Sequence, residues 1–517
     1  MGKISPNAVP FQIRHCKRII AVVPALSRAG LRTIGKGTVV RASIPLRIRM
    51  RLPSTRLPRQ LVAMIVTAFA ALAFAQVSGA QEFIRGAPLQ YEPSTPAADT
   101  AAPKSSAPTT ATARPRSVPV YDADGSVAVP VASEKAMRYY YSGLVIWLLN
   151  AFLGMAILLV LCFSGFAARM RDFAQRAGSN WFLTIVLYWA LFSTLLFLVK
   201  LPLSYYAGFV NEHAFGLSNQ THADWMIYKL KSLAVTIAGG ALVLWIPYLL
   251  LKKSPTRWWF YAGLAAFPVV VFSIFIQPIV IEPIFNDFGP VKNPALEQKI
   301  LKLAERSGIE HARVFEVDKS RETKSTNAYV TGIGQTQRIV FWDTLTASMS
   351  DEQVLSVMGH EIGHYVLNHI WKLIAFTLLL MLLMLYIVHR LAHMVISRFQ
   401  RRLGFTMLSD IASLPLILLL LSTTSIVHTP IGNAVNRQVE HEADVFTLEL
   451  TRDNRAAAEG FVQLIDDNLD NPRPHWLDQL LRGSHPTNAE RIEFANTYKP
   501  WMTGQPLRYG ALIKPEK

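Results

Sequence analysis

The sequence predicts a multi-pass α-helical membrane protein that also carries a discontinuous α+β domain. Half of the chain's 517 residues are hydrophobic (51%), and many of them are gathered in long apolar runs. Each run approaches or exceeds the length of helix that crosses a hydrocarbon core of about 30 Å. More polar segments with strand-like and helix-like patterns lie between the fourth and fifth runs and after the sixth. A large soluble protein with buried helices, the competing interpretation, would not usually show six such runs.

The first 81 residues are expected to form a basic leader with a signal sequence or signal anchor. They contain thirteen Lys or Arg and no Asp or Glu, so they supply most of the formal charge of +17. This charge therefore does not indicate a nucleic-acid partner. Basic residues around Met50, an apolar run over 61–74 and small residues at 78–80 follow the pattern of a secretory signal. Two alternatives stay open: Met50 is the true start, or residues 1–49 are a real extension before an uncleaved first membrane helix.

Residues 82–131 are expected to be a disordered linker. They are rich in Pro, Ala, Thr and Ser, a composition that buries too little apolar surface to fold alone. The chain has two cysteines, Cys16 in the leader and Cys162 in an apolar run. We therefore expect neither a disulfide framework nor a metal held by cysteines.

The membrane domain is expected in two parts, with four spans within 135–282 and two further spans within 370–428. The predicted spans are Leu144–Phe163, Trp181–Leu201, Leu233–Leu251, Trp258–Ile281, Ile370–Val388 and Ile411–Ile426. The α+β domain is split by the last two spans into a first part, 283–369, and a second part, 429–500, before a tail, 501–517. Helix is predicted at 295–307 and over most of Arg455–Asn496, and strands at Arg313–Val317 and Arg338–Trp342.

One pentapeptide carries the strongest chemical signal: His360, Glu361, Ile362, Gly363 and His364. A capping box, Ser350 to Gln353, and apolar residues at helical spacing predict that this segment is a helix. The two histidines then lie one turn apart on one face, where they could bind one Zn²⁺, while Glu361 projects beside the metal and could take a proton from an attacking water. This layout is typical of metallopeptidases. The alternative is an amphipathic helix that carries two polar histidines.

A third protein ligand is predicted downstream at Glu440. Asp444 follows one turn later, so one helix could present a ligand and a carboxylate that orients a ligand histidine. A solvated acidic helix face is an equally good interpretation of these two residues by composition alone. His389 and His393 are also four apart, but they lack an intervening carboxylate and follow an apolar span, so we expect them to be interfacial residues.

The whole set of motifs resembles the CAAX prenyl endopeptidases, integral-membrane zinc proteases related to the HtpX heat-shock proteases. The resemblance covers roughly residues 135–500. The motifs that carry it are His360 to His364, Glu440 to Asp444, Asn327-Ala328-Tyr329 with Thr331-Gly332, Arg338-Ile339-Val340 leading to Asp343-Thr344-Leu345, and Ser484-His485-Pro486 with Glu490-Arg491. The soluble part is accordingly expected to be a gluzincin-like zinc-metallopeptidase domain.

The resemblance implies a role for each matching residue. One Zn²⁺ per chain would be bound by His360, His364 and Glu440, and Glu361 would be the general base. His485 would stabilise the oxyanion, and Asp444 and Arg437 would support the ligands from behind. Arg437 follows Asn436, where the family usually has a serine. The remaining residues implied by the resemblance, on an edge strand that pairs with an extended substrate, are Asn327, Ala328 and Tyr329.

These expectations define a membrane-embedded zinc endopeptidase that hydrolyses membrane-associated or misfolded proteins. Its partners would be protein or peptide substrates and the lipid bilayer, with no nucleic acid. The alternative is a catalytically inactive membrane scaffold or transporter that retains a structural zinc site. A bacterial inner membrane is the expected location. Basic loops at 169–176, 252–257 and 390–402 are expected to face the cytoplasm, which favours a zinc site on the periplasmic side. The family resemblance instead favours a zinc site that faces the cytosol, which would fit better if the apolar run at 61–74 were retained as a seventh span.

Overall fold

The computed structural model describes residues 117–310, 312–332 and 338–515. The predicted leader and the linker up to residue 116 lie outside these residues. In the described part of the chain, six helical segments are long and apolar enough to cross a membrane. They are Glu134–Phe163, Trp181–Ala214, His222–Lys253, Trp258–Phe285, His369–Leu403 and Ile411–Thr451. Each one contains a predicted span and extends beyond it, because helix formation continues through polar turns that hydropathy alone leaves out.

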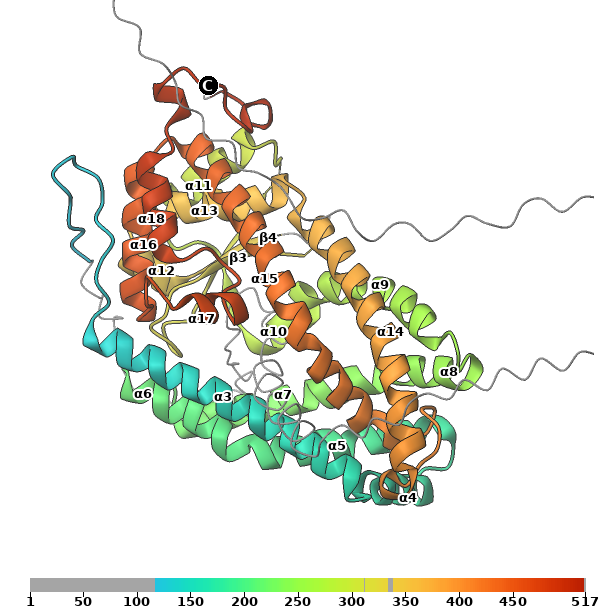
Figure 1. Cartoon of the computed structure of the whole chain (residues 1–517). Coiled ribbons are helices and arrows are strands. Elements are labelled where there is room, and N and C mark those ends of the chain that lie inside the picture. Colours follow the sequence, from blue (N-terminus) through green and yellow to red (C-terminus); the bar gives the residue numbers. More distant parts are fainter. Residues whose placement is uncertain (1–116, 311, 333–337, 516–517) are drawn as a thin grey trace, which may run out of the picture. The chain divides into compact units, whose positions relative to one another are not determined.

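The first four segments precede the sheet (Figure 1). Ser133 caps the first helix by accepting a hydrogen bond from the backbone N–H of Ala136. Pro202 and Pro268 lie inside two of the membrane helices. The elements are α3 (Glu134–Phe163), α4 (Phe166–Ala177), α5 (Trp181–Tyr205), η1 (Tyr206–Asn211), α6 (Glu212–Ala214), α7 (His222–Val243), α8 (Trp245–Lys253), α9 (Trp258–Ile276), η2 (Gln277–Ile281) and α10 (Glu282–Phe285).

A small mixed sheet lies between the membrane segments in sequence. Its strands have the order β1-β2-β4-β3, with β2 and β4 parallel and the other pairs antiparallel, so β3 is an edge strand. The predicted edge position of the segment that begins at Asn327 is therefore confirmed for β3. The elements are β1 (Phe288–Gly289), α11 (Pro294–Arg306), β2 (Val314–Val317), β3 (Ala328–Thr331) and β4 (Arg338–Trp342).

The remaining helices complete the peptidase domain and the last two spans. Ser350 and Gln353 form the predicted capping box at the start of α13. The elements are α12 (Asp343–Ser348), α13 (Asp351–Val366), α14 (His369–Leu403), η4 (Ile411–Ser413), α15 (Leu414–Thr451), α16 (Asn454–Asn468), α17 (Trp476–Leu481), α18 (Asn488–Thr497), η5 (Pro500–Met502) and η6 (Gly510–Leu512).

The helix that carries the pentapeptide does not run directly into the next span. It ends at Val366, and Asn368 adopts a left-handed backbone conformation (φ 56°) before α14 begins at His369. Asn tolerates this conformation better than most residues because its short polar side chain bonds locally. The break separates the direction of α13 from that of α14.

The end of the linker that was predicted to be disordered is bonded to the peptidase domain. Within residues 117–131, Tyr121 and Val127 form an antiparallel bridge. Asn496 on α18 bonds both backbone groups of Val127, at 2.9 and 3.1 Å, and Glu459 on α16 accepts from the hydroxyl of Tyr121. The prediction failed here because Val127 is buried (2% exposed) against distant helices, a contact that local composition does not reveal.

Two glycines of α13 let it cross α15 at very short distance. A Cβ at Gly359 would lie 3.2 Å from Cγ2 of Thr447, and one at Gly363 would lie 3.2 Å from Cδ1 of Phe446. Such contacts are tighter than ordinary van der Waals separation, so larger residues would push the helices apart. This crossing brings the two predicted motif helices side by side.

Candidate metal centre

The first two predicted ligands come from α13. His360 and His364 lie one turn apart, and their Nε2 atoms are 3.0 Å from each other. Both nitrogens therefore point to one place, while each Nδ1 points away from it, toward other partners. This convergence is what the i, i+4 spacing predicted.

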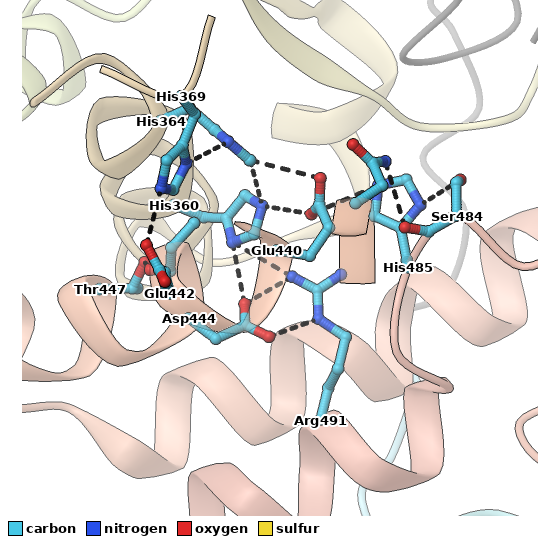
Figure 2. Close-up of polar contacts among 12 residues, drawn as sticks. His360, His364, His369, Glu440, Glu442, Asp444, Thr447, Ser484, His485 and Arg491 are labelled. Carbon is cyan, nitrogen blue, oxygen red and sulfur yellow. Dashed lines mark hydrogen bonds and ion pairs between the residues drawn. The ribbon is translucent and has the colours of Figure 1, made fainter. Parts of the chain in front are cut away.

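The third predicted ligand reaches the same place from α15 (Figure 2). Oε2 of Glu440 lies 3.0 Å from Nε2 of His360, and Oε1 lies 3.5 Å from Nε2 of His364. Ligand atoms of the three residues all lie within 4.8 Å of one another, so they could hold one metal ion. Two imidazoles and one carboxylate are a donor set that suits zinc.

Asp444 supports His360 from behind. Its Oδ1 accepts a hydrogen bond from Nδ1 of His360 at 2.8 Å. Burial would lower the pKa of His360, but the bonds to Asp444 and Glu440 outweigh it and raise that pKa to about 10. The carboxylates of Asp444 and Glu440 therefore give this position a negative potential, which favours binding of a cation in place of the second imidazole proton.

Arg491 is a site residue to which the sequence assigned no role. Its Nη2 and Nε bond the two oxygens of Asp444, at 2.6 and 2.9 Å, which is a bidentate geometry. Burial would lower the pKa of Arg491, but the attraction of Asp444 outweighs it and raises that pKa. The Glu490-Arg491 motif was the available signal, but only the fold brings α18 to Asp444.

Glu361, the predicted general base, lies beside the sheet edge. Burial raises the pKa of its carboxyl group, although the charges of His360 and His364 act in the opposite direction. A hydrogen bond from the backbone of Val330 on β3 also acts to lower it. A raised pKa brings a carboxylate closer to the operating pH, which suits a group that must both take and release a proton.

His485 approaches the same cluster from the loop after α17. Its Nε2 lies 3.4 Å from Oε2 of Glu440, and its side chain is 49% exposed. The charge of Glu440 acts to raise the pKa of His485, but desolvation by the residues around the ring and the positive charges of Arg491 and the motif histidines lower it overall. A neutral imidazole at this position can still donate one hydrogen bond.

Arg437, predicted to support the site from outside the ligands, contacts the backbone of this loop. Its Nη1 donates to the carbonyls of Gln479 and Gly483, at 3.1 and 2.7 Å. The neighbouring Asn436 donates to the carbonyl of Ser484 at 3.1 Å. These bonds fix the backbone that carries His485, because carbonyls at a helix end need such donors.

The three predicted substrate residues separate in the structure. Asn327 and Ala328 line a cavity of about 140 Å³ that also touches Glu361 and His485. Tyr329 lies on the opposite face of β3, where it packs beside Val340. Successive residues of a strand point to opposite faces, so Tyr329 points away from the cavity that Ala328 lines.

Three further histidines, His369, His389 and His393, lie outside the proposed set of metal ligands. Nδ1 of His389 accepts from the indole N–H of Trp258 at 3.0 Å, and Nδ1 of His393 donates to the carbonyl of His389 at 2.7 Å. His369, by contrast, is buried (1% exposed) against His364. No role for His369 followed from the sequence, because its contact with His364 depends on the break at Asn368.

The fold and this cluster together define a membrane-embedded metallopeptidase. Two family models match consecutive parts of the chain. The model described as CAAX prenyl protease N-terminal, five membrane helices, matches residues 128–287, and that of peptidase family M48 matches residues 290–499.

Individual proteins similar to this chain point to the same family. The Bacillus subtilis protein described as uncharacterized metalloprotease YhfN is 36% identical over 365 residues, which cover 70% of this chain and 85% of that protein. CAAX prenyl protease 1 of Saccharomyces cerevisiae is 32% identical over 323 residues, 58% of this chain and 70% of that one. The crystal structure of S. mikatae Ste24p has the same fold, with a TM-score of 0.63, 24% identity and coverage of 84% of this chain and 98% of that chain.

The chain belongs to peptidase family M48, among the Ste24-like CAAX prenyl proteases. It is an integral-membrane zinc endopeptidase. The predicted family, fold class and enzyme class are confirmed, and no comparison favours the inactive scaffold.

Proposed function

We propose that His360, His364 and Glu440 bind one zinc ion per chain and that this centre hydrolyses peptide bonds. The observation that carries the proposal is the convergence of both Nε2 atoms and the Glu440 carboxylate within 4.8 Å. When bound there, zinc lowers the pKa of a coordinated water to about 7 and polarises a carbonyl group.

Different residues of the chain would then transfer the proton and stabilise the negative charge that develops during hydrolysis. Glu361 takes the proton of the attacking water and returns it to the leaving amine, which its raised pKa favours. His485 donates a hydrogen bond to the oxyanion from the opposite side of the cluster. Asp444, held by Arg491, keeps the proton of His360 on Nδ1, so that its Nε2 lone pair remains free.

We propose that the substrate binds in extended form along β3. This strand is at the edge of the sheet, and Val330 on it is bonded to Glu361. Main-chain pairing at an edge strand recognises any extended peptide, with side-chain pockets adding selectivity. Membrane-associated or misfolded proteins fit this mode. Two of the relatives described above are a CAAX prenyl protease and a structure of Ste24p, which makes prenylated peptides a second substrate to test.

The Glu361→Ala variant tests both parts. In membranes containing the full chain, we expect the variant to keep its zinc, lose peptide hydrolysis and retain bound substrates that can be identified after purification. Farnesylated and unmodified versions of one peptide, given to the wild type, would distinguish prenyl recognition from general recognition. Hydrolysis retained by Glu361→Ala would disprove the mechanism.

We further propose that the zinc centre faces the periplasm of a bacterial inner membrane. Arg171 of α4 bonds Asp410 just before η4, at the end of the membrane segments remote from α13 (Figure 1). The basic residues of α4 and of the last turn of α14 thus gather away from the peptidase domain. Positively charged loops favour the cytoplasmic side. Alkaline phosphatase fused after Thr451 should be active, whereas an active cytoplasmic reporter there would overturn this orientation.

A further inference from the structure

The two histidines of the proposed zinc centre are supported in different ways. His360 is bonded directly to the carboxylate of Asp444. His364 instead has Nδ1 3.0 Å from Nδ1 of His369, and the two rings meet edge to face at 73°. Figure 2 shows His369 behind His364, on the side away from Glu440. His369 is therefore placed to act on His364 and not on the metal itself.

The chemistry of two facing imidazole nitrogens fixes their protons. With Nε2 of His364 directed to the metal position, its Nδ1 carries the proton and donates to Nδ1 of His369. His369 must then carry its own proton on Nε2, which lies 3.4 Å from Oε2 of Glu442. The result is a chain of two hydrogen bonds that ends on a carboxylate.

The carboxylate at the end of this chain is held by three further groups. Nζ of Lys372 lies 3.4 Å from Oε2 of Glu442, and Nη2 of Arg508 lies 3.7 Å from Oε1. Gln438 donates to Oε1 at 3.4 Å. These contacts keep the carboxylate turned toward His369.

Arg508 belongs to the C-terminal tail, beyond the residues that match the M48 family model (290–499). Its position is fixed by Glu449 of α15, which accepts from the backbone N–H groups of Arg508 and Tyr509, both at 2.7 Å. Glu449 is fully buried (0% exposed), so this anchor is shielded from water. The tail is thereby connected to the support of His364.

The break between α13 and α14 makes the contact possible. In an uninterrupted helix, residues five apart point about 140° away from each other, so His369 would not meet His364. The left-handed conformation of Asn368 turns the chain and brings the two rings together.

We propose that His369 and Glu442 form a relay that orients His364 and strengthens its bond to zinc. His369 and Glu442 are positioning residues, because neither touches the substrate or the metal position. The relay extends the direct support that Asp444 gives to His360, with one imidazole inserted. This inference rests on the proposed role of His364 as a zinc ligand.

Zinc affinity, measured by competition with a chromophoric chelator on the detergent-solubilised full chain, tests the relay. Loss of such a supporting group typically weakens zinc binding by about 10- to 100-fold, which is the effect expected for His369→Leu. His369→Gln keeps an acceptor oxygen and should recover most of the affinity. Glu442→Gln keeps the size of a partly exposed side chain and should weaken zinc binding by about 10-fold, with the unfolding temperature unchanged.

Glu352→Gln is the matched control, because Glu352 lies in the first turn of α13 and its side chain is 58% exposed. It should bind zinc as the wild type does. Wild-type affinity in both His369→Leu and Glu442→Gln would overturn the relay. Should His369→Leu not fold, Glu442→Gln alone decides. Failure of the wild type to bind zinc would instead refute the ligand assignment itself, so the two failures are distinguishable.

Discussion

The helices α13 and α15 are tightly packed where they cross. Three of the membrane segments, by contrast, bury few of their residues. At the crossing, Gly359 and Gly363 leave no room for even a methyl group without adjustment. In the apolar windows of the segments His222–Lys253, Trp258–Phe285 and His369–Leu403, only 6% of the residues are buried. The two helices that carry the proposed metal ligands are therefore held in close contact, whereas these three segments leave most of their side chains accessible to lipid or substrate.

The largest effect should come from filling the crossing. Gly363→Leu would force side-chain atoms against Phe446 and Ala443, which lie within 3.4 Å of a Cβ at this position. We expect a loss of about 1–3 kcal/mol of stability and at least a 100-fold loss of activity, because α13 would move relative to Glu440. Thermal unfolding and hydrolysis assays measure both.

Gly239→Leu in α7 is the matched control for this substitution. A Cβ at Gly239 meets nothing within 4 Å. The variant should keep wild-type activity and stability. Equal damage from the two substitutions would contradict the difference in packing.

A smaller effect is expected at the support of His360. Asp444→Asn weakens the bond from Nδ1 of His360 and breaks the charge pair with Arg491. Zinc affinity should fall by about 10- to 100-fold, as measured by chelator competition. Asp172→Asn on α4, where the side chain is 51% exposed, should leave the affinity as it is. An unchanged affinity in Asp444→Asn would show that the buried pair does not serve the metal.

A change that loosens the loop carrying His485 should lower kcat and leave zinc binding unchanged. Arg437→Met removes two hydrogen bonds to the carbonyls of Gln479 and Gly483. A loss of about 1–2 kcal/mol of positioning corresponds to a kcat about 10-fold lower, with zinc content unchanged. Arg473→Met, at a 62% exposed position, is the control and should have no effect on kcat. Loss of zinc in Arg437→Met would instead mean that this loop supports the ligands.

The smallest effect should be a shift in the pH dependence of stability. Burial raises the pKa of Asp470 to about 6, although a bond from Asn488 acts in the opposite direction. A carboxyl group whose pKa is raised on folding stabilises the fold when protonated, so stability falls as the pH rises from about 4 through 6. Asp470→Asn should therefore have a higher Tm than the wild type at pH 8, with the difference vanishing toward pH 4.5. A constant difference across this range would contradict the raised pKa.

Local signals explain which parts of the site the sequence could predict. The capping box at Ser350 and the four-residue spacing of His360 and His364 lie within one helix, so they required no tertiary information. Glu440 was assigned to the site through the family resemblance, because α15 reaches α13 only in the folded chain.

The parts that the sequence missed depend on contacts between distant segments. Arg491 on α18 bonds Asp444 on α15, a contact between two helices far apart in the sequence. His369 contacts His364 only because the chain turns at the left-handed residue Asn368. The segment between Tyr121 and Val127 is held in place by contacts with α16 and α18, which its own composition does not reveal. A pattern of residues along the chain cannot specify such contacts before the fold brings them together.

The amount of zinc bound per chain tests the central claim most directly. It should be measured on the purified full-length protein for the wild type, Glu440→Gln and the exposed control Glu352→Gln. We predict one zinc ion per chain in the wild type and the control, and a large loss of zinc together with hydrolysis in Glu440→Gln. A Glu440→Gln protein that keeps one tightly bound zinc ion would contradict the metal centre formed by α13 and α15.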